Sequence, residues 1–171
     1  MRDRICVTRV NLTLSVKNAR SCDGCTKCCE GWLPAKIMGH QLSPGNPCPL
    51  LVSDVGCSIY EDRPERPCKT YYCFWQTELS VPEKFKPSLT NTIITWGNVT
   101  GFRELILVRA GGYDSELVEW FAGYVKENNI NATWQIGDQE FFNGDPEYIE
   151  KRKKENKRKY DKFDTEDSGP L

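Results

Sequence analysis

Cysteine and proline are crowded together in residues 22–73, which hold eight of the chain's nine cysteines and six of its ten prolines. Proline has no backbone N–H and clashes with the preceding helical turn, so long helices are excluded from this segment. The segment also has few aliphatic side chains for its length, and their burial alone would not offset the entropy lost on folding. We therefore expect crosslinks to hold this part of the chain together.

The spacing of the cysteines indicates metal coordination. A CxxCxxCC run is followed by four further cysteines, and the candidate ligands are Cys22, Cys25, Cys28, Cys29, Cys48, Cys57, Cys68 and Cys73. Two-residue gaps bring successive thiolates round a tight turn to one point, as zinc and iron-sulfur centres both require. Adjacent side chains diverge, so Cys28 and Cys29 should serve different metal centres or opposite sides of one polynuclear centre. Eight thiolates match two four-cysteine sites, and a single cluster with spare cysteines is also compatible.

Two other uses of these cysteines were weighed as alternatives. A disulfide scaffold is typical of secreted domains, but Asn11, Thr13 and Ser15 interrupt the apolar run that a signal peptide would need at the N-terminus. Redox-active thiols are the other alternative, although one CxxC pair would suffice for disulfide exchange. We therefore predict a cytoplasmic protein, in a compartment that keeps thiols reduced.

Charge and hydropathy argue against several partners. The chain has 23 basic and 24 acidic residues and a net charge of -1, so it has no overall field that attracts nucleic acid or anionic lipid. It also has no run of about 18 apolar residues, the minimum for a membrane-spanning helix. Neither a membrane nor nucleic acid is an expected partner, and an unknown protein partner stays open.

Regular elements are predicted on both sides of the cysteines. Residues 92–96 and 104–109 should form a hairpin joined through Gly97, Asn98 and Gly101. Further strands are predicted at 10–16, where apolar and polar residues alternate, and at 133–136.

Two helices are predicted towards the C-terminus. Asp114 or Ser115 can cap the first, which should end at Asn128 and Asn129. Its apolar stripe comprises Leu117, Trp120, Phe121 and Tyr124. A proline after Asp145 starts the second helix, expected at 146–160.

The second predicted helix is basic, but acidic residues accompany its cations at helical spacing. The expected pairs are Glu147 with Lys151, Glu150 with Lys154, and Glu155 with Lys159. A solvated, self-paired helix is therefore favoured over a nucleic-acid patch. Residues 161–171 are predicted to be a disordered acidic tail. We expect an α+β fold with a small loop-rich cysteine-metal core, short antiparallel strands and two C-terminal helices. One cysteine-cluster domain at 1–145, with its motif core at 22–94, should be followed by the basic helix at 146–160.

Several residues near the cysteines are secondary candidates. Cys6 lies in an apolar context and is expected to be a buried free cysteine. His40, the only histidine, is at best an outer-shell candidate. Arg63 and Arg66 could donate hydrogen bonds to sulfur and offset its charge, or could pair with neighbouring carboxylates. The aromatic residues expected to keep water off a metal are Trp32, Tyr60, Tyr71, Tyr72, Phe74 and Trp75.

The motif resembles a known family. The CxxCxxCC run, Cys48, the segment GCSIYEDRP at 56–64, Pro67-Cys68 and Tyr72-Cys73 together resemble the YkgJ-type cysteine-cluster family of zinc- or iron-chelating domains. The resemblance covers residues 22–94 and implies chelation by the eight cysteines of this segment. One branch of the family, flagellin lysine N-methylase, links the cysteine pattern to protein methylation.

Two functions follow from these observations. The first is an intracellular metal-binding protein that coordinates zinc or an iron-sulfur cluster through eight cysteines. The alternative is a cluster-dependent enzyme similar to the flagellin lysine N-methylase branch, performing protein methylation or redox chemistry. No G-x-G-x-x-G fingerprint is present to support a nucleotide cofactor. The native metal, its stoichiometry and any catalytic residues are left open by the sequence.

Overall fold

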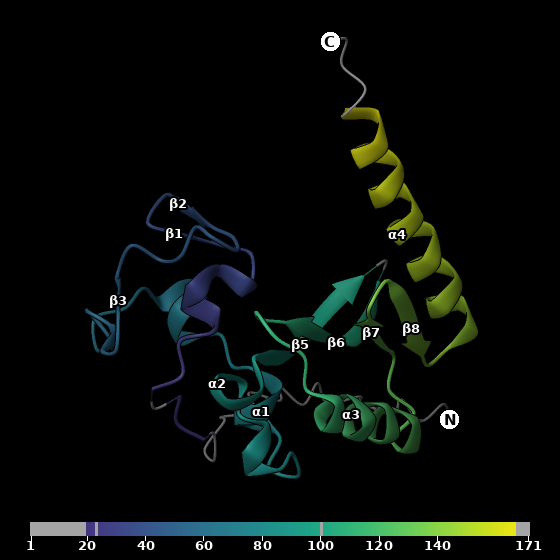
Figure 1. Ribbon diagram of the computed structural model, residues 1–171, viewed down its shortest axis with the longest axis horizontal. Coiled ribbons are helices and arrows are strands. Elements are labelled where there is room, and N and C mark those ends of the chain that lie inside the picture. Colours follow the sequence, from purple (N-terminus) through teal and green to yellow (C-terminus); the bar gives the residue numbers. More distant parts are fainter. Residues whose placement is uncertain (1–19, 23, 100, 167–171) are drawn as a thin grey trace, which may run out of the picture.

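The computed structural model describes residues 20–22, 24–99 and 101–166, which form two adjoining parts (Figure 1). We call residues 20–73 the cysteine lobe and residues 74–166 the sheet lobe. Helices and mainly antiparallel strands confirm the predicted α+β class. Cys6 and the strand predicted at 10–16 lie outside the described residues.

A four-stranded sheet in the order β5-β6-β7-β8 organises the sheet lobe. β5 (Thr92–Val99) and β6 (Phe102–Arg109) form the predicted hairpin, but Gly97 and Asn98 are paired strand residues and not part of its turn. β7 (Ala132–Ile136) confirms the strand predicted at 133–136, whereas β8 (Gln139–Asn143) was not predicted. β6 and β7 pair in parallel, in addition to the predicted antiparallel pairs.

The parallel pair requires a crossover, which α3 (Ser115–Glu127) provides. Asp114 caps this helix as predicted, because its Oδ1 accepts a hydrogen bond from the Leu117 N–H at 2.8 Å. The helix ends at Asn128, also as predicted. Its buried residues are Leu117, Val118, Phe121 and Val125. Trp120 and Tyr124, expected on the same stripe, are half-buried and stack with ring centroids 5.0 Å apart.

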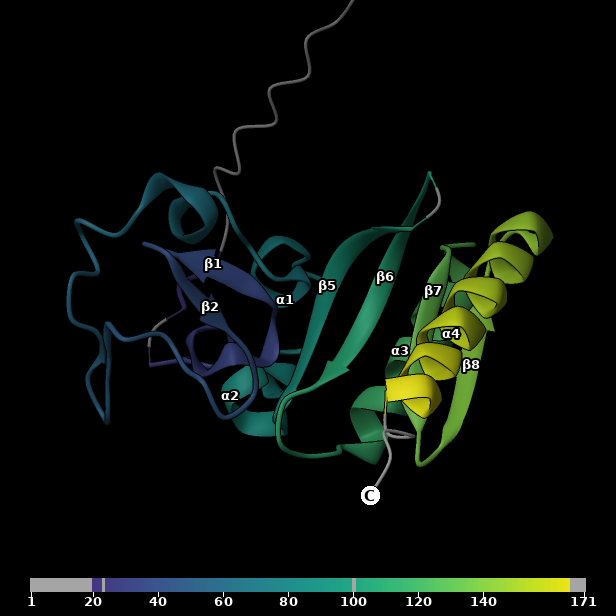
Figure 2. The ribbon, with the colours of Figure 1, turned by 90° about the horizontal axis from the view of Figure 1, so that it is seen from above.

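The last helix, α4 (Pro146–Glu166), lies on the opposite face of the sheet from α3 (Figures 1 and 2). Tyr148 on α4 donates a hydrogen bond to the fully buried carboxylate of Glu104 on β6. The Arg152 Nε lies 3.4 Å from the same carboxylate oxygen. Burial raises the pKa of Glu104, so this carboxylate depends on its two partners for its charge.

The predicted end of α4 at residue 160 was wrong. The helix continues to Glu166, so residues 161–166 are helical and do not belong to a disordered tail, while 167–171 lie outside the described residues. Two predicted ion pairs are present: Lys151 with Glu147 at 2.7 Å, and Lys154 with Glu150 at 2.7 Å. The third predicted pair, Glu155 with Lys159, involves a side chain outside the described part.

Tyr148→Phe is expected to lower the free energy of unfolding by about 1–3 kcal/mol, the cost of depriving a buried polar group of its partner. The loss is sharp because Tyr148 donates to Glu104 Oε2, and the other carboxylate oxygen, Oε1, has no hydrogen-bond partner within the described residues. Denaturant unfolding at neutral pH measures the effect. Tyr113→Phe, at an exposed tyrosine, is the matched control. Equal stability of both variants would contradict a structural role for the buried hydroxyl.

The cysteine lobe is built from short elements, as its prolines predict. They are η1 (Cys28–Trp32), β1 (Ala35–Ile37), β2 (His40–Leu42), β3 (Leu51–Val52), β4 (Gly56–Cys57) and η2 (Glu65–Lys69). β1 pairs with β2 and β3 with β4, giving two small antiparallel hairpins. α1 (Phe74–Thr77), η3 (Glu83–Phe85) and α2 (Pro87–Thr90) then connect this lobe to the sheet.

A glycine in η1 allows a close contact between two segments of the cysteine lobe. Gly31, in η1, has a positive φ of 90°. A Cβ added there would lie 2.1 Å from the backbone oxygen of Ser43. Only glycine therefore permits this close approach between η1 and the chain after β2.

Two separate hydrophobic cores support the two lobes. The main core joins the sheet and α3 to the start of α1, and it includes Cys73, Phe74 and Trp75. The small core of the cysteine lobe contains just three buried residues, Ile37, Leu42 and Cys48. Burial therefore stabilises the sheet lobe far more than the cysteine lobe.

Candidate metal centre

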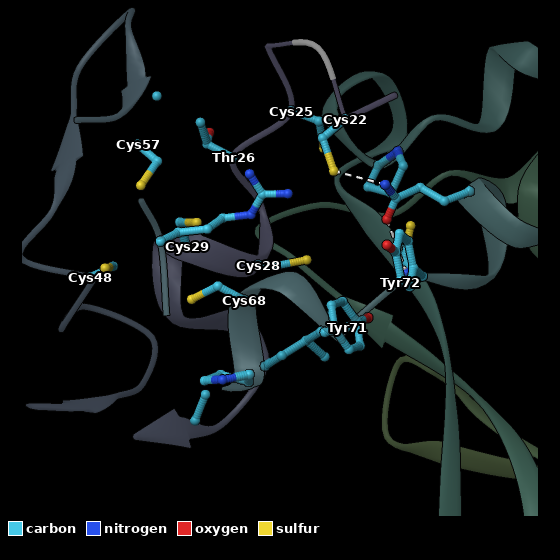
Figure 3. Close-up of a pocket in the computed structure, with 18 of the residues that line it drawn as sticks. Cys22, Cys25, Thr26, Cys28, Cys29, Cys48, Cys57, Cys68, Tyr71 and Tyr72 are labelled. Atoms are coloured by element: carbon cyan, nitrogen blue, oxygen red, sulfur yellow. Dashed lines mark hydrogen bonds between the residues drawn. The ribbon is translucent and has the colours of Figure 1, made fainter. Parts of the chain in front are cut away.

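All eight predicted ligands line one cavity of about 780 Å³ in the cysteine lobe (Figure 3). Every one of them is a free thiol. The tertiary structure therefore gathers cysteines that are widely spread along the chain. In Figure 3, Cys29, Cys48, Cys57 and Cys68 lie towards one side of the cavity, and Cys22, Cys25 and Cys28 towards the other.

We call Cys22, Cys25, Cys28 and Cys73 the first cysteine group. A tight turn holds its first two members, since the Cys25 N–H donates to the Cys22 carbonyl at 2.8 Å. Cys73 belongs to the main core, and Cys28 packs against it. Burial raises the pKa of Cys28 well above its ordinary value, and the charges of Cys73 and Cys25 are the next largest causes of the increase.

The second cysteine group consists of Cys29, Cys48, Cys57 and Cys68. Cys48 is part of the small core, against which Cys29 and Cys68 pack. The Cys48 N–H donates to the Cys29 carbonyl at 2.8 Å. Burial raises the pKa of Cys29 to about 12, and the largest electrostatic contributions come from the other three thiols of the group. Two adjacent residues therefore belong to different groups, because Cys28 faces the main core and Cys29 the small one.

Hydrogen-bond donors surround the first cysteine group. The buried Gln76 donates its Nε2 to Cys22 Sγ at 2.9 Å and accepts the Cys73 N–H with its Oε1 at 3.2 Å. The Cys73 sulfur in turn accepts hydrogen bonds from the backbone N–H groups of Trp75 and Gln76. The Tyr71 hydroxyl donates to Thr95 Oγ1 at 3.1 Å and is also hydrogen-bonded to Cys28. These hydrogen bonds stabilise negative charge on the sulfur atoms of the first cysteine group.

Gln76, Thr95 and Trp96 also line the cavity and were not predicted from the sequence. Gln76 follows Cys73 at the third position of α1, where a glutamine side chain can reach back to the capping residue. That spacing is the signal that could have identified it. Thr95 and Trp96 come from β5, and no local pattern connects them with the cysteines.

Arg63 lies near both cysteine groups. Its charge lowers the pKa of Cys22 and of Cys68, although burial raises both overall. Its Nη1 donates to the Tyr60 carbonyl at 2.5 Å, and its guanidinium lies 3.9 Å from the centre of the Tyr60 ring. Within the described residues, no ion pair to a neighbouring carboxylate is found for Arg63 or Arg66. The charge-offsetting role predicted for the arginines therefore has support at Arg63.

Other predicted residues divide into those at the cavity and those away from it. Tyr60, Tyr71, Tyr72 and Trp75 line the cavity, whereas Trp32 and Phe74 pack in or against the main core. His40 Nε2 is 3.0 Å from the carbonyl oxygen of Pro47, and this histidine is not among the residues that line the cavity. The structure therefore gives no support to a ligand role for His40.

The thiols suit a soft metal chemically, but they do not stand at coordinating positions. Among the described residues, no three Cys, His, Asp or Glu side chains are arranged so that they could hold one metal ion as they stand. Coordination would require the sulfur atoms of a group to move closer together. The raised pKa values of Cys28 and Cys29 keep these thiols protonated at neutral pH, so a metal would have to displace their protons.

Comparisons with known proteins give no further assignment. No family model, curated protein or solved structure matches the chain. In the part of the chain that the structure describes, none of the helices combines the length and the apolar character needed to cross a membrane.

Proposed function

We propose that this chain is a metal-binding protein with two four-cysteine centres, one for each cysteine group. The observation that carries the proposal is the division of eight free thiols around one cavity into two sets of four. Four thiolates complete a tetrahedral zinc site, and they also suffice to hold an iron-sulfur cluster. The resemblance of the CxxCxxCC pattern to the YkgJ-type family points to the same chemistry.

The environment of the groups supports thiolate coordination. Each group places its sulfur atoms in a partly buried setting, where thiolates would repel one another once deprotonated, so a cation is their natural partner. The Arg63 guanidinium supplies one positive charge near both groups. Eight free thiols also require a reducing compartment, so we place the protein in the cytoplasm.

Metal analysis of the purified full chain tests the proposal. Protein prepared without oxygen should contain roughly two zinc ions per chain, or iron together with acid-labile sulfide. Zinc alone would favour a structural or carrier role, whereas iron with sulfide would favour electron transfer or cluster-dependent catalysis. A metal-free protein whose eight thiols all react at once with a thiol reagent would overturn the proposal.

A cluster-dependent enzyme similar to the flagellin lysine N-methylase branch is the second candidate. The observation that favours it is that the cavity extends beyond the thiols to Tyr72, Trp75 and Trp96. Aromatic walls of this kind accept a cofactor or an apolar part of a substrate. Calorimetry with S-adenosylmethionine separates the candidates, since a chelator or carrier should give no binding heat.

Gln76→Leu is expected to weaken metal binding at the first cysteine group by about 10–100-fold, the usual effect of removing a group that hydrogen-bonds a ligand. The substitution removes the Gln76 N–H that donates to the Cys22 sulfur and the Gln76 oxygen that accepts from the Cys73 N–H. Competition with a chromophoric chelator measures the affinity. Gln139→Leu, on the exposed edge of β8, serves as the control. Unchanged affinity in Gln76→Leu would show that the amide does not support the centre.

A further inference from the structure

The two cysteine groups differ in how firmly the fold holds them. Cys73 is 5 % exposed and belongs to the main core, against which Cys28 packs. The second group is attached to the small core, whose buried residues number three. Moving the second group therefore disturbs little buried surface, whereas moving Cys28 or Cys73 of the first group disturbs the core of the sheet lobe.

The backbone around the second group is also weakly supported. Cys57 ends β4, which pairs with β3 through only two residue pairs, Leu51 with Cys57 and Val52 with Gly56. The loop between these strands carries Val55, whose side chain is 75 % exposed. A two-residue hairpin with an exposed tip opens at low cost in free energy.

The sulfur atoms of the second group also have fewer side-chain hydrogen bonds than those of the first group. In the first group, the Gln76 side chain donates to the Cys22 sulfur, and Cys28 is hydrogen-bonded to the Tyr71 hydroxyl. For the second group, no side-chain hydrogen bond to sulfur is found in the described part of the chain, and the Cys68 sulfur interacts with its own backbone N–H. Ligand sulfurs without such hydrogen bonds are less firmly oriented and leave a bound metal more readily.

We infer that the second cysteine group is an exchange site, which takes up and hands over a thiophilic metal ion while the first group retains its ion. This inference rests on the proposed function, and it assigns metal exchange to one centre and metal retention to the other. Exchange proceeds by ligand substitution without a change of oxidation state. An incoming sulfur or nitrogen ligand forms one bond to the ion as the bond to Cys57 or Cys68 breaks, and the released thiolate takes a proton from water.

The test uses the full chain loaded with zinc without oxygen and then mixed with excess 4-(2-pyridylazo)resorcinol. Zinc is expected to leave the protein in two phases of equal amplitude. The rate constant of the fast phase should be at least about tenfold that of the slow phase. Cys68→Ser should remove the fast phase and Cys73→Ser the slow one. Release in a single phase, or loss of the fast phase in Cys73→Ser, would overturn the inference.

A second measurement on the unaltered chain guards against variants that fail to fold. Alkylation during release, followed by mass spectrometry, identifies which thiols become free in each phase. Cys29, Cys48, Cys57 and Cys68 should be modified together in the fast phase. Modification of the first group at the same rate would contradict the inference. A starting preparation with fewer than two zinc ions would instead contradict the two-centre proposal, before any rate is measured, and the inference would fall with it.

Discussion

Removal of the metal from the full chain is expected to unfold the cysteine lobe while the sheet lobe stays folded. The small core has three buried residues, and the strands of this lobe are two or three residues long. Structural zinc in small domains contributes apparent free energies of about 10–16 kcal/mol, comparable with the whole stability of an ordinary domain. The main core of the sheet lobe depends on apolar packing instead.

Hydrogen exchange of backbone amides after chelation separates the two lobes in one sample. The amides of Cys48 and Ser58, which bond to the carbonyls of Cys29 and Leu50, should lose their protection. The Leu105 amide, which bonds to the Asn131 carbonyl within the sheet lobe, is the internal control and should keep it. Unchanged exchange, circular dichroism and thermal stability after complete metal removal would show that metal does not organise the cysteine lobe.

Cys28→Ser and Cys29→Ser are each expected to lose about half of the bound metal, and from different centres. Serine keeps the size of the side chain but replaces a soft thiolate with a hard, weakly acidic hydroxyl. Because Cys28 belongs to the first group and Cys29 to the second, Cys28→Ser should retain the fast-releasing ion and Cys29→Ser the slow one.

Metal analysis together with cobalt substitution measures this difference, since sulfur-to-cobalt charge-transfer bands report on each surviving centre. Cys6→Ser is the control and should keep the full metal content, because Cys6 lies outside the cysteine pattern of residues 22–73. Full metal content and identical spectra in both test variants would mean that neither cysteine is a ligand. Equal loss of both centres from either variant would point to one polynuclear centre.

The described basic side chains of the last helix, α4, have partners close by. Two of the described ion pairs of α4 join Lys151 and Lys154 to glutamates one turn earlier, so these two cations are balanced. Lys153 lies 5.6 Å from the ring of Phe142, where an aromatic face stabilises its charge. Nucleic-acid binding depends on a concentrated positive field, so a self-paired helix remains our prediction over a nucleic-acid patch.

Local sequence was sufficient for most elements of the sheet lobe. The cap at Asp114, the end of α3 at Asn128 and the start of α4 at Pro146 depend on side chains acting within a few residues of themselves. The strand β8 and the true end of α4 were missed. Gln139–Asn143 follows β7 after a short turn and is a strand because it pairs with β7, which no local pattern specifies.

The sequence alone determined which residues could bind metal, because the CxxCxxCC spacing and the prolines are properties of the chain itself. It also required that Cys28 and Cys29 point apart, since neighbouring side chains diverge. Tertiary structure alone decided how the eight thiols divide, because the partners of each come from distant segments. Cys73 reaches Cys28 through the main core, and Cys48 reaches Cys29 through the small core. Which core a side chain enters depends on packing between distant segments. The spacing of the cysteines along the chain does not predict that packing.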